Sequence, residues 1–335
     1  MNLSKHLWQI AGSDKFQALP ILSFPAIQKL NVTVAQLVKD PVLLSDVMAY
    51  IAAQTDTIAA VTPMDLSVEA EAFGANVVIP TDEIPVVTGQ LICGEEAANA
   101  LQIPSLDQGR LSVCIETIRL AKQKIQDKPV LTGMIGPYSL AGRLMDVTEI
   151  MYICYDDPDV VHTVLRKATD FLIGYGKALK EAGADGMIMA EPLAGILSPD
   201  MAAEFSVPYV KQIIDALQDE DFAVVYHNCG NSVSSMLSDI FTLGAAAYHF
   251  GNAVDMEQVM STAPDTCLCM GNVDPASVIA EGPAESVTAA TEQLLHTCGN
   301  YKNFLPSSGC DIPAHAKWDN ILAFFAAVAR ANKPM

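Results

Sequence analysis

The chain has 335 residues, of which 51% are hydrophobic and 17% are charged, a composition that suits one large domain with a well-buried core. Its formal net charge is −20 and it has only five arginines, which disfavours nucleic-acid binding, because such binding depends on neutralising phosphates. No apolar stretch approaches the ~20 residues of a membrane-spanning helix, and the N-terminus lacks signal-peptide features, so we expect one cytoplasmic domain over residues 1–335.

Eight short apolar stretches alternate with helical patterns along the chain. Strands are expected at residues 19–24, 57–62, 130–135, 186–190, 223–227, 246–250, 267–271 and 303–306. Helices are expected at residues 44–53, 111–125, 150–182, 199–217, 233–243, 256–260, 284–295 and 317–331. This alternation is typical of a parallel sheet covered by helices. Eight units indicate a (β/α)8 TIM barrel with N-terminal helical additions, and a doubly wound open sheet is the alternative.

The segment 74–92 interrupts the repeat after the second expected strand. Two apolar runs within it, at 76–80 and 85–89, predict a small inserted β-hairpin. We expect this hairpin to overhang one end of the barrel as a lid or a substrate-binding flap.

One imidazole and two thiols follow expected strands. His227 and Cys229 lie one residue apart, and Cys310 follows the last expected strand. Three such ligands without an obvious fourth are typical of a catalytic zinc site with an open position, because a structural zinc site normally has four protein ligands. We therefore predict that these three residues bind zinc.

Other polar residues also follow expected strands, where barrel enzymes carry their functional groups. The candidate catalytic residues are Glu191, His249 and Asp274. Each is a candidate for a fourth zinc ligand that the substrate displaces, or for a partner that orients His227. The alternative is that they are ordinary strand-end polar groups.

Four further residues are candidates for substrate binding. They are Arg143, Asn231, Asn252 and Asn272. Arg143 is the only arginine close to the end of an expected strand, and it predicts an anchor for an anionic group. The alternative for Arg143 is a surface ion pair.

A second segment, His296-Thr-Cys298-Gly-Asn300, nearly repeats the pattern around His227. It concludes the expected helix 284–295, which places it at the end of the barrel opposite the strand-end residues. We predict a structural role for this copy.

The chain resembles the uroporphyrinogen decarboxylase superfamily, and within it the cobamide-dependent branch that includes the methylcobamide:coenzyme M methyltransferases. The resemblance spans nearly the whole chain, and its clearest marks are the segments 71–74, 87–89, 136–137, 181–185, 227–231, 271–273 and 309–313. It implies a barrel in which His227, Cys229 and Cys310 hold Zn²⁺. The arginine-containing N-terminal motif of the decarboxylases is missing, which counts against decarboxylation. Some coenzyme M enzymes carry an acidic pair where this chain has His249, so His249 is a candidate replacement for a carboxylate ligand.

The same resemblance implies a zinc-dependent methyltransferase of one-carbon metabolism. The methyl group would move between a corrinoid (methylcobalamin) carried by a partner protein and a small substrate, for which a thiol such as coenzyme M is the first candidate. The alternatives are a methyl ether substrate, a metal-free decarboxylase of a porphyrinogen-like carboxylate, and a non-catalytic barrel that binds a corrinoid or a thiol.

Overall fold

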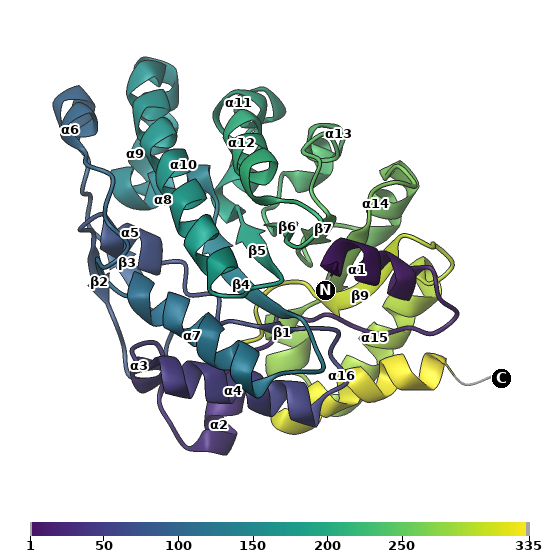
Figure 1. The fold of residues 1–335 in the computed structure, drawn as a ribbon. Helices are drawn as coiled ribbons and strands as arrows, with labels where there is room; N and C mark the ends of the chain where they lie inside the picture. Colours follow the sequence, from purple (N-terminus) through teal and green to yellow (C-terminus); the bar gives the residue numbers. More distant parts are fainter. Residues whose placement is uncertain (1, 333–335) are drawn as a thin grey trace.

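The computed structural model describes residues 2–332, in which helices surround a curled parallel sheet (Figure 1). The strands of this sheet are β1 (Ala60–Val61), β4 (Val130–Ile135), β5 (Gly186–Ala190), β6 (Ala223–Asn228), β7 (Ala247–Phe250), β8 (Cys269–Val273) and β9 (Phe304–Ser308). They lie side by side in chain order, and every pairing is parallel. The expected α/β architecture is therefore confirmed.

Residues 18–21 lie between the two outer strands, β9 and β1. The N–H of Ile58 donates to the carbonyl of Ala18 at 3.0 Å, and the N–H of Leu19 donates to the carbonyl of Pro306 at 3.1 Å. This segment occupies the place of the eighth barrel strand, but the strand expected at 19–24 does not form. Pro20 has no N–H for a strand ladder, and the chain turns into a 3-10 helix, η1 (Phe24–Ala26), directly afterwards.

Helices surround the sheet. They are α1 (Leu3–Ala11), α2 (Ile27–Leu30), α3 (Val34–Leu37), α4 (Pro41–Gln54), α5 (Val68–Ala72), α6 (Gly94–Ala100), α7 (Leu111–Lys124), α8 (Pro137–Met145), α9 (Val147–Asp156), α10 (Pro158–Glu181), α11 (Pro199–Phe205), α12 (Val207–Leu217), α13 (Leu237–Ile240), α14 (Met256–Thr262), α15 (Ala284–Cys298) and α16 (Trp318–Ala331). Further helical segments are the 3-10 helices η2 (Pro192–Ile196) and η3 (Val233–Ser235) and the π-helix η4 (Pro275–Ala280). Within residues 2–332, no helix combines the length and the apolarity that crossing a membrane would require.

Three of the expected helices are each divided in the structure, and the shortest of them, expected at 233–243, is η3 followed by α13. The helix expected at 150–182 is α9 followed by α10, with the break at Asp157 before Pro158. The helix expected at 199–217 is α11 followed by α12, with the break at Ser206, two residues before Pro208. Proline cannot donate a backbone hydrogen bond and disfavours helical geometry in the residue before it, which accounts for the breaks at Asp157 and Ser206.

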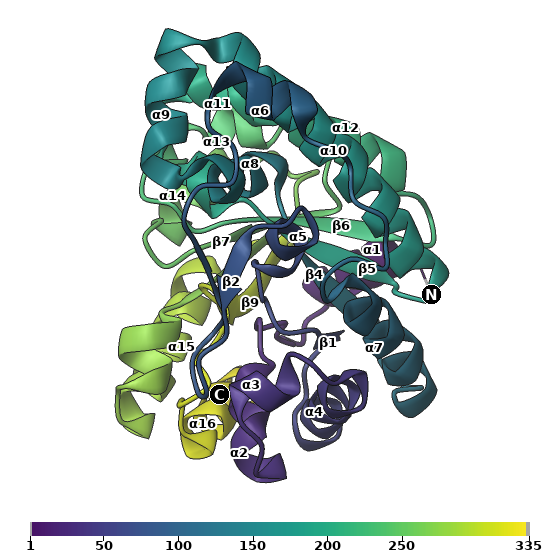
Figure 2. The ribbon, with the colours of Figure 1, turned by 90° about the vertical axis from the view of Figure 1, so that its left-hand side faces the viewer.

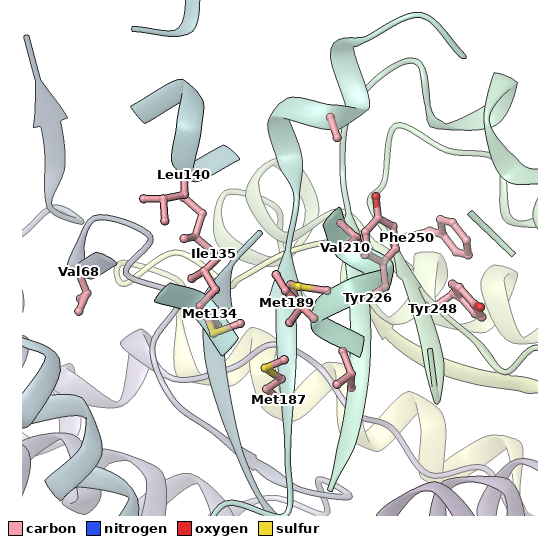
Figure 3. Close-up of a cluster of buried hydrophobic side chains, with 14 of the residues drawn as sticks. Val68, Met134, Ile135, Leu140, Met187, Met189, Val210, Tyr226, Tyr248 and Phe250 are labelled. Atoms are coloured by element: carbon pink, nitrogen blue, oxygen red, sulfur yellow. The ribbon is translucent and has the colours of Figure 1, made fainter. Parts of the chain in front are cut away.

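Side chains alternate between two cores along each strand. Met134, Met187, Met189 and Tyr226 face outward and pack beneath the surrounding helices (Figure 3). The intervening residues, such as Leu131, Ile188, Val225 and Leu305, form a second core inside the barrel, which also takes up Leu3 and Leu7 of α1. His227 shares the phase of Val225 and pairs in register with His249 of β7. Both imidazoles therefore point into the barrel.

The expected hairpin within 74–92 forms from β2 (Asn76–Val78) and β3 (Val86–Thr88), which pair antiparallel with Val77 opposite Val87. It lies at the end of the barrel remote from α1, and Figure 2 shows it in front of that end. The carboxyl ends of the parallel strands lie at this same end, because Met64 and Arg143, which follow β1 and β4, line one pocket with Ile84 and Pro85 of the hairpin. A lid or flap function of the hairpin remains a prediction.

Candidate metal centre

His227, Cys229 and Cys310 converge at the carboxyl ends of β6 and β9. One potential ligand atom from each of them lies within 4.8 Å of the other two. The Nε2 of His227 is 3.5 Å from the Sγ of Cys310, although the two residues are 83 positions apart in the chain. The His227 side chain is buried and both cysteines are half-buried. The structure thus brings together the three residues that the sequence singles out.

The donor set and its spacing fit a zinc ion. Zinc bonds of about 2.0 Å to nitrogen and 2.3 Å to sulfur, at tetrahedral angles, place two ligand atoms about 3.5 Å apart. The separation of His227 Nε2 and Cys310 Sγ has this value. Among the residues that the structure describes, no other group of histidine, cysteine and acidic side chains has metal-binding spacing. Three protein donors would leave a fourth position for a small ligand.

The two thiols of this centre are coupled by a hydrogen bond. The bond from Cys310 lowers the pKa of Cys229. The same bond, together with burial, raises the pKa of Cys310 to about 12. One sulfur is therefore prepared to become a thiolate, the form in which cysteine binds metals, while its neighbour holds the proton.

A chain of hydrogen bonds fixes the orientation of His227. Its Nδ1 lies 3.3 Å from the carbonyl oxygen of His249 and 2.8 Å from Nδ1 of the same residue. A carbonyl can only accept, so Nδ1 of His227 carries the hydrogen. His227 Nε2 then has a free lone pair directed toward the thiols.

The protonation pattern of His249, the partner of His227, follows from its own hydrogen bonds in the same way. The Ser307 hydroxyl donates to the carbonyl of Leu19 at 2.7 Å, so it accepts a hydrogen bond from His249 Nε2 at 2.8 Å. This leaves Nδ1 of His249 as an acceptor for His227. Burial, followed by the neighbouring His227, lowers the pKa of His249 well below its usual value. Both ring nitrogens of His249 are engaged, which supports the orienting role rather than that of a fourth ligand.

Glu191 follows β5 and caps a helix. Its Oε1 accepts from the backbone N–H of Ser139 at 2.6 Å, and its Oε2 accepts from that of Tyr138 at 3.2 Å, both in the first turn of α8. The side chain is fully buried, and burial raises its pKa to about 7. A catalytic role for Glu191 stays a prediction, but its carboxylate already serves the N-terminus of α8.

Asp274 follows β8 and also caps a helix, the π-helix η4. Its Oδ1 accepts from the backbone N–H groups of Ala276 and Ser277. Its Oδ2 accepts from the Ser277 hydroxyl at 2.7 Å and from the Asn252 amide at 3.1 Å. These four hydrogen bonds account for its place in the loop, and a catalytic role stays a prediction here as well.

The three candidate asparagines differ in their surroundings. Asn272 donates to the carbonyls of Gly251 and Val254 at 3.0 and 2.6 Å and so holds the loop after β7. Asn252 is exposed and lies against Gly309, where a Cβ would come within 2.6 Å of the Asn252 nitrogen. Asn231 is exposed. Asn252 is therefore packed next to the loop that carries Cys310, and substrate binding by all three stays a prediction.

Two residues near the metal ligands were missed by the sequence reasoning. Ser307 completes the hydrogen-bond chain through His249, and its phase two residues after Leu305 is the signal that could have placed it inside the barrel. Asp311 accepts from the N–H of Met64 at 3.3 Å through Oδ2, while its Oδ1 is buried without a hydrogen bond. No sequence pattern marks Asp311 apart from its position after Cys310.

Residues 17–331 match the family model described as uroporphyrinogen decarboxylase (URO-D). The chain is 29% identical over 237 residues to the methylcobamide:CoM methyltransferase MtbA of Methanosarcina mazei, covering 70% of this chain and 69% of that protein. It is 28% identical over 253 residues to the uroporphyrinogen decarboxylase of Chlorobaculum tepidum, covering 73% and 71%. The solved structure of a methyltransferase from Methanosarcina mazei shares the fold, with a TM-score of 0.88, 23% identity and coverage of 98% and 99%.

Proposed function

We propose that this chain, which belongs to the uroporphyrinogen decarboxylase (URO-D) family, is a zinc-dependent methyltransferase acting between a corrinoid protein and a small thiol such as coenzyme M. The similar proteins include both methyltransferases and decarboxylases, so similarity alone does not separate the two activities. The observation that carries the proposal is the convergence of His227, Cys229 and Cys310 within 4.8 Å. A metal ion held by these three donors can activate a thiol, whereas a metal-free reaction does not require such a donor set.

The three side chains would hold the ion through Nε2 of His227 and through the two sulfurs. Zinc bound there supplies the positive charge that keeps a substrate thiol in its nucleophilic thiolate form at neutral pH. The coupling between Cys229 and Cys310 eases the loss of the first ligand proton, because it lowers the pKa of Cys229. His249 stays neutral and keeps the Nε2 lone pair of His227 directed at the ligand cluster.

A metal-free decarboxylase would use a different kind of site. A porphyrinogen carries several carboxylates, and a pocket for it needs several cationic groups at the barrel mouth. Arg143 is the only arginine that follows the end of a sheet strand closely, on α8 after β4. The described residues therefore favour the methyltransferase.

The proposal is tested by methyl transfer from free methylcobalamin. We expect about one zinc per chain, and a change in the cobalamin absorption spectrum when coenzyme M or homocysteine is added. A chelator should abolish the change, and added zinc should restore it. Methoxyarenes with reduced cobalamin form a parallel arm, and activity there alone would replace the thiol with a methyl ether. Undiminished transfer to thiols in fully zinc-free protein would contradict the proposal.

A further inference from the structure

Arg143 differs from the other four arginines in having no polar partner. Arg110 is paired with Asp65 and Glu71, Arg119 with Glu116, and Arg330 with Glu292, while Arg166 donates to the Thr163 hydroxyl. Within residues 2–332, Arg143 makes no hydrogen bond and no ion pair. The chain has 39 acidic and 19 basic residues, so carboxylates are abundant, and none of them is placed beside this guanidinium.

The side chain of Arg143 is also partly shielded from solvent. The residue is half-buried, and burial lowers its pKa, with no neighbouring carboxylate to raise it. A charge that is partly removed from water without a partner is costly. The fold therefore maintains a cation that an anion from outside would stabilise.

A pocket of about 180 Å³ lies against this side chain. Its walls come from the loop after β1, through Met64 and Leu66, and from the turn of the hairpin, through Ile84 and Pro85. Apart from Ser67 the wall residues are apolar, so an ion pair with Arg143 would be less screened there than in water. The volume suits the end of a small molecule and not a porphyrinogen.

The pocket and the metal centre are linked through Met64. Met64 lines the pocket, and its N–H donates to Oδ2 of Asp311. Asp311 directly follows the metal ligand Cys310. Both sites lie at the carboxyl ends of the strands, and the contact between Met64 and Asp311 connects them.

We infer that Arg143 and the pocket beneath the hairpin turn bind the anionic end of the substrate whose thiol goes to the metal centre. The substrate class is a short thiol that carries a sulfonate or a carboxylate, both of which match the planar fork of a guanidinium. This inference rests on the proposed function. It adds the feature by which the protein selects among thiols.

The test compares 2-mercaptoethanesulfonate, 3-mercaptopropionate and neutral 2-mercaptoethanol as methyl acceptors. Loss of a charge-assisted hydrogen bond corresponds to about a 10- to 100-fold change. We expect Arg143→Ala to raise KM for the anionic thiols by this factor, with kcat, zinc content and the KM for 2-mercaptoethanol nearly unchanged. Arg143→Lys should recover part of the loss. Arg119→Ala, which removes an exposed ion pair on α7, is the matched control and should leave the preference intact.

Calorimetric titration of the zinc-loaded protein with the same thiols gives a readout that does not need turnover. A preference for the anionic thiols that disappears in Arg143→Ala supports the inference even if no methyl transfer is found, in which case only the proposed function fails. Equal binding of charged and neutral thiols by the unmodified protein would overturn the inference. So would an equal loss for both kinds of thiol in Arg143→Ala. The ratio between sulfonate and carboxylate thiols then identifies which anion the pocket fits.

Discussion

The chain contains the pattern His-x-Cys-Gly-Asn twice, at 227–231 and 296–300, and the two copies have different fates. The first copy ends strand β6, and its imidazole and thiol meet Cys310. The second copy lies at the end of helix α15, where His296 is exposed and Cys298 is fully buried. Residues two apart on a helix lie about 200° apart around its axis, so they face opposite sides. The same sequence pattern therefore brings potential metal ligands together at the end of a strand and separates them on a helix.

The glycines of the two copies differ in the same way. A Cβ on Gly230 would lie 2.4 Å from the Cα of Gly195, so the glycine allows the loops after β6 and β5 to approach each other. Gly299 is the C-cap of α15 and donates its N–H to the carbonyl of Leu295 at 2.8 Å. The first glycine lets two loops at the barrel mouth pack closely, and the second ends a helix.

The largest expected effect is the loss of zinc on substitution of a ligand from the first site. Cys310→Ala should reduce bound zinc from about one per chain to a trace and abolish methyl transfer, because two remaining ligands hold zinc far less firmly than three. Cys298→Ala is the matched control and should retain both. Zinc is measured by mass spectrometry after dialysis, with circular dichroism to verify folding. Zinc retained by a folded Cys310→Ala protein, or lost only in Cys298→Ala, would reverse the assignment of the two copies.

The two cysteines of the repeated pattern should also differ in reactivity. The pKa of Cys229 is lowered by its bond with Cys310, whereas burial raises the pKa of Cys298 to about 12. We expect iodoacetamide to modify Cys229 in zinc-free folded protein on the order of 100-fold faster than Cys298, because the thiolate is the reactive form. Peptide mass spectrometry measures the rates, with exposed Cys93 as the internal reference. Added zinc should protect Cys229 alone, and equal rates at Cys229 and Cys298 would contradict this prediction.

Much of the fold could be predicted from local patterns. Apolar runs located β4, β5 and β6 closely, because buried parallel strands are apolar on both faces. The strand predicted at 19–24 does not form, since its apolar residues fit the pattern while Pro20 prevents the ladder. Helix α8 was missed because it is short and directly follows β4, so one apolar stretch covers both.

The metal ligands could be predicted because a histidine and two cysteines are an uncommon set of strand-end residues, and because the apolar runs before them locate the strand ends. The roles of Glu191, His249 and Asp274 could not be separated, because each follows a strand and each is polar. What separates them is the partner that each side chain meets, namely a helix N-terminus for the two carboxylates and His227 for His249. For Glu191 and His249 these contacts join residues 52 and 22 positions apart, and no spacing in the sequence encodes them. Asp274, by contrast, caps the helix that begins at the next residue.

The next largest expected effect is on zinc affinity when the hydrogen-bond partner of His227 is removed. His249→Ala removes the closer of the two acceptors for Nδ1 of His227 and leaves the backbone carbonyl at 3.3 Å. Loss of such a partner lowers metal affinity by about 10- to 100-fold. His296→Ala, in the second copy, should leave affinity unchanged. Competition with a chromophoric zinc chelator measures both. Since His249 is fully buried, His249→Gln serves as a second variant that preserves bulk and an acceptor and should lose less. Unchanged affinity in a folded His249→Ala protein would show that the backbone carbonyl of residue 249 is a sufficient partner for His227 and that the imidazole is not needed.

The smallest expected effect lies one step further from the metal, at Ser307. Ser307→Ala leaves the Nε2–H of His249 and the carbonyl of Leu19 without their partner, which costs stability by about 1–3 kcal/mol. Zinc affinity should fall by only about 2- to 10-fold, because His249 can still accept from His227, and Ser307→Thr should restore it. The exposed His296 has no comparable chain among the described residues, so this variant probes a property of the first copy alone. In a His249→Ala background the serine substitution should have no further effect on zinc affinity, since the hydroxyl acts through that imidazole. If the losses of zinc affinity were additive, Ser307 would instead support the site by packing in the barrel interior. The two copies of the pattern would then differ by their place in the fold and not by a chain of hydrogen bonds.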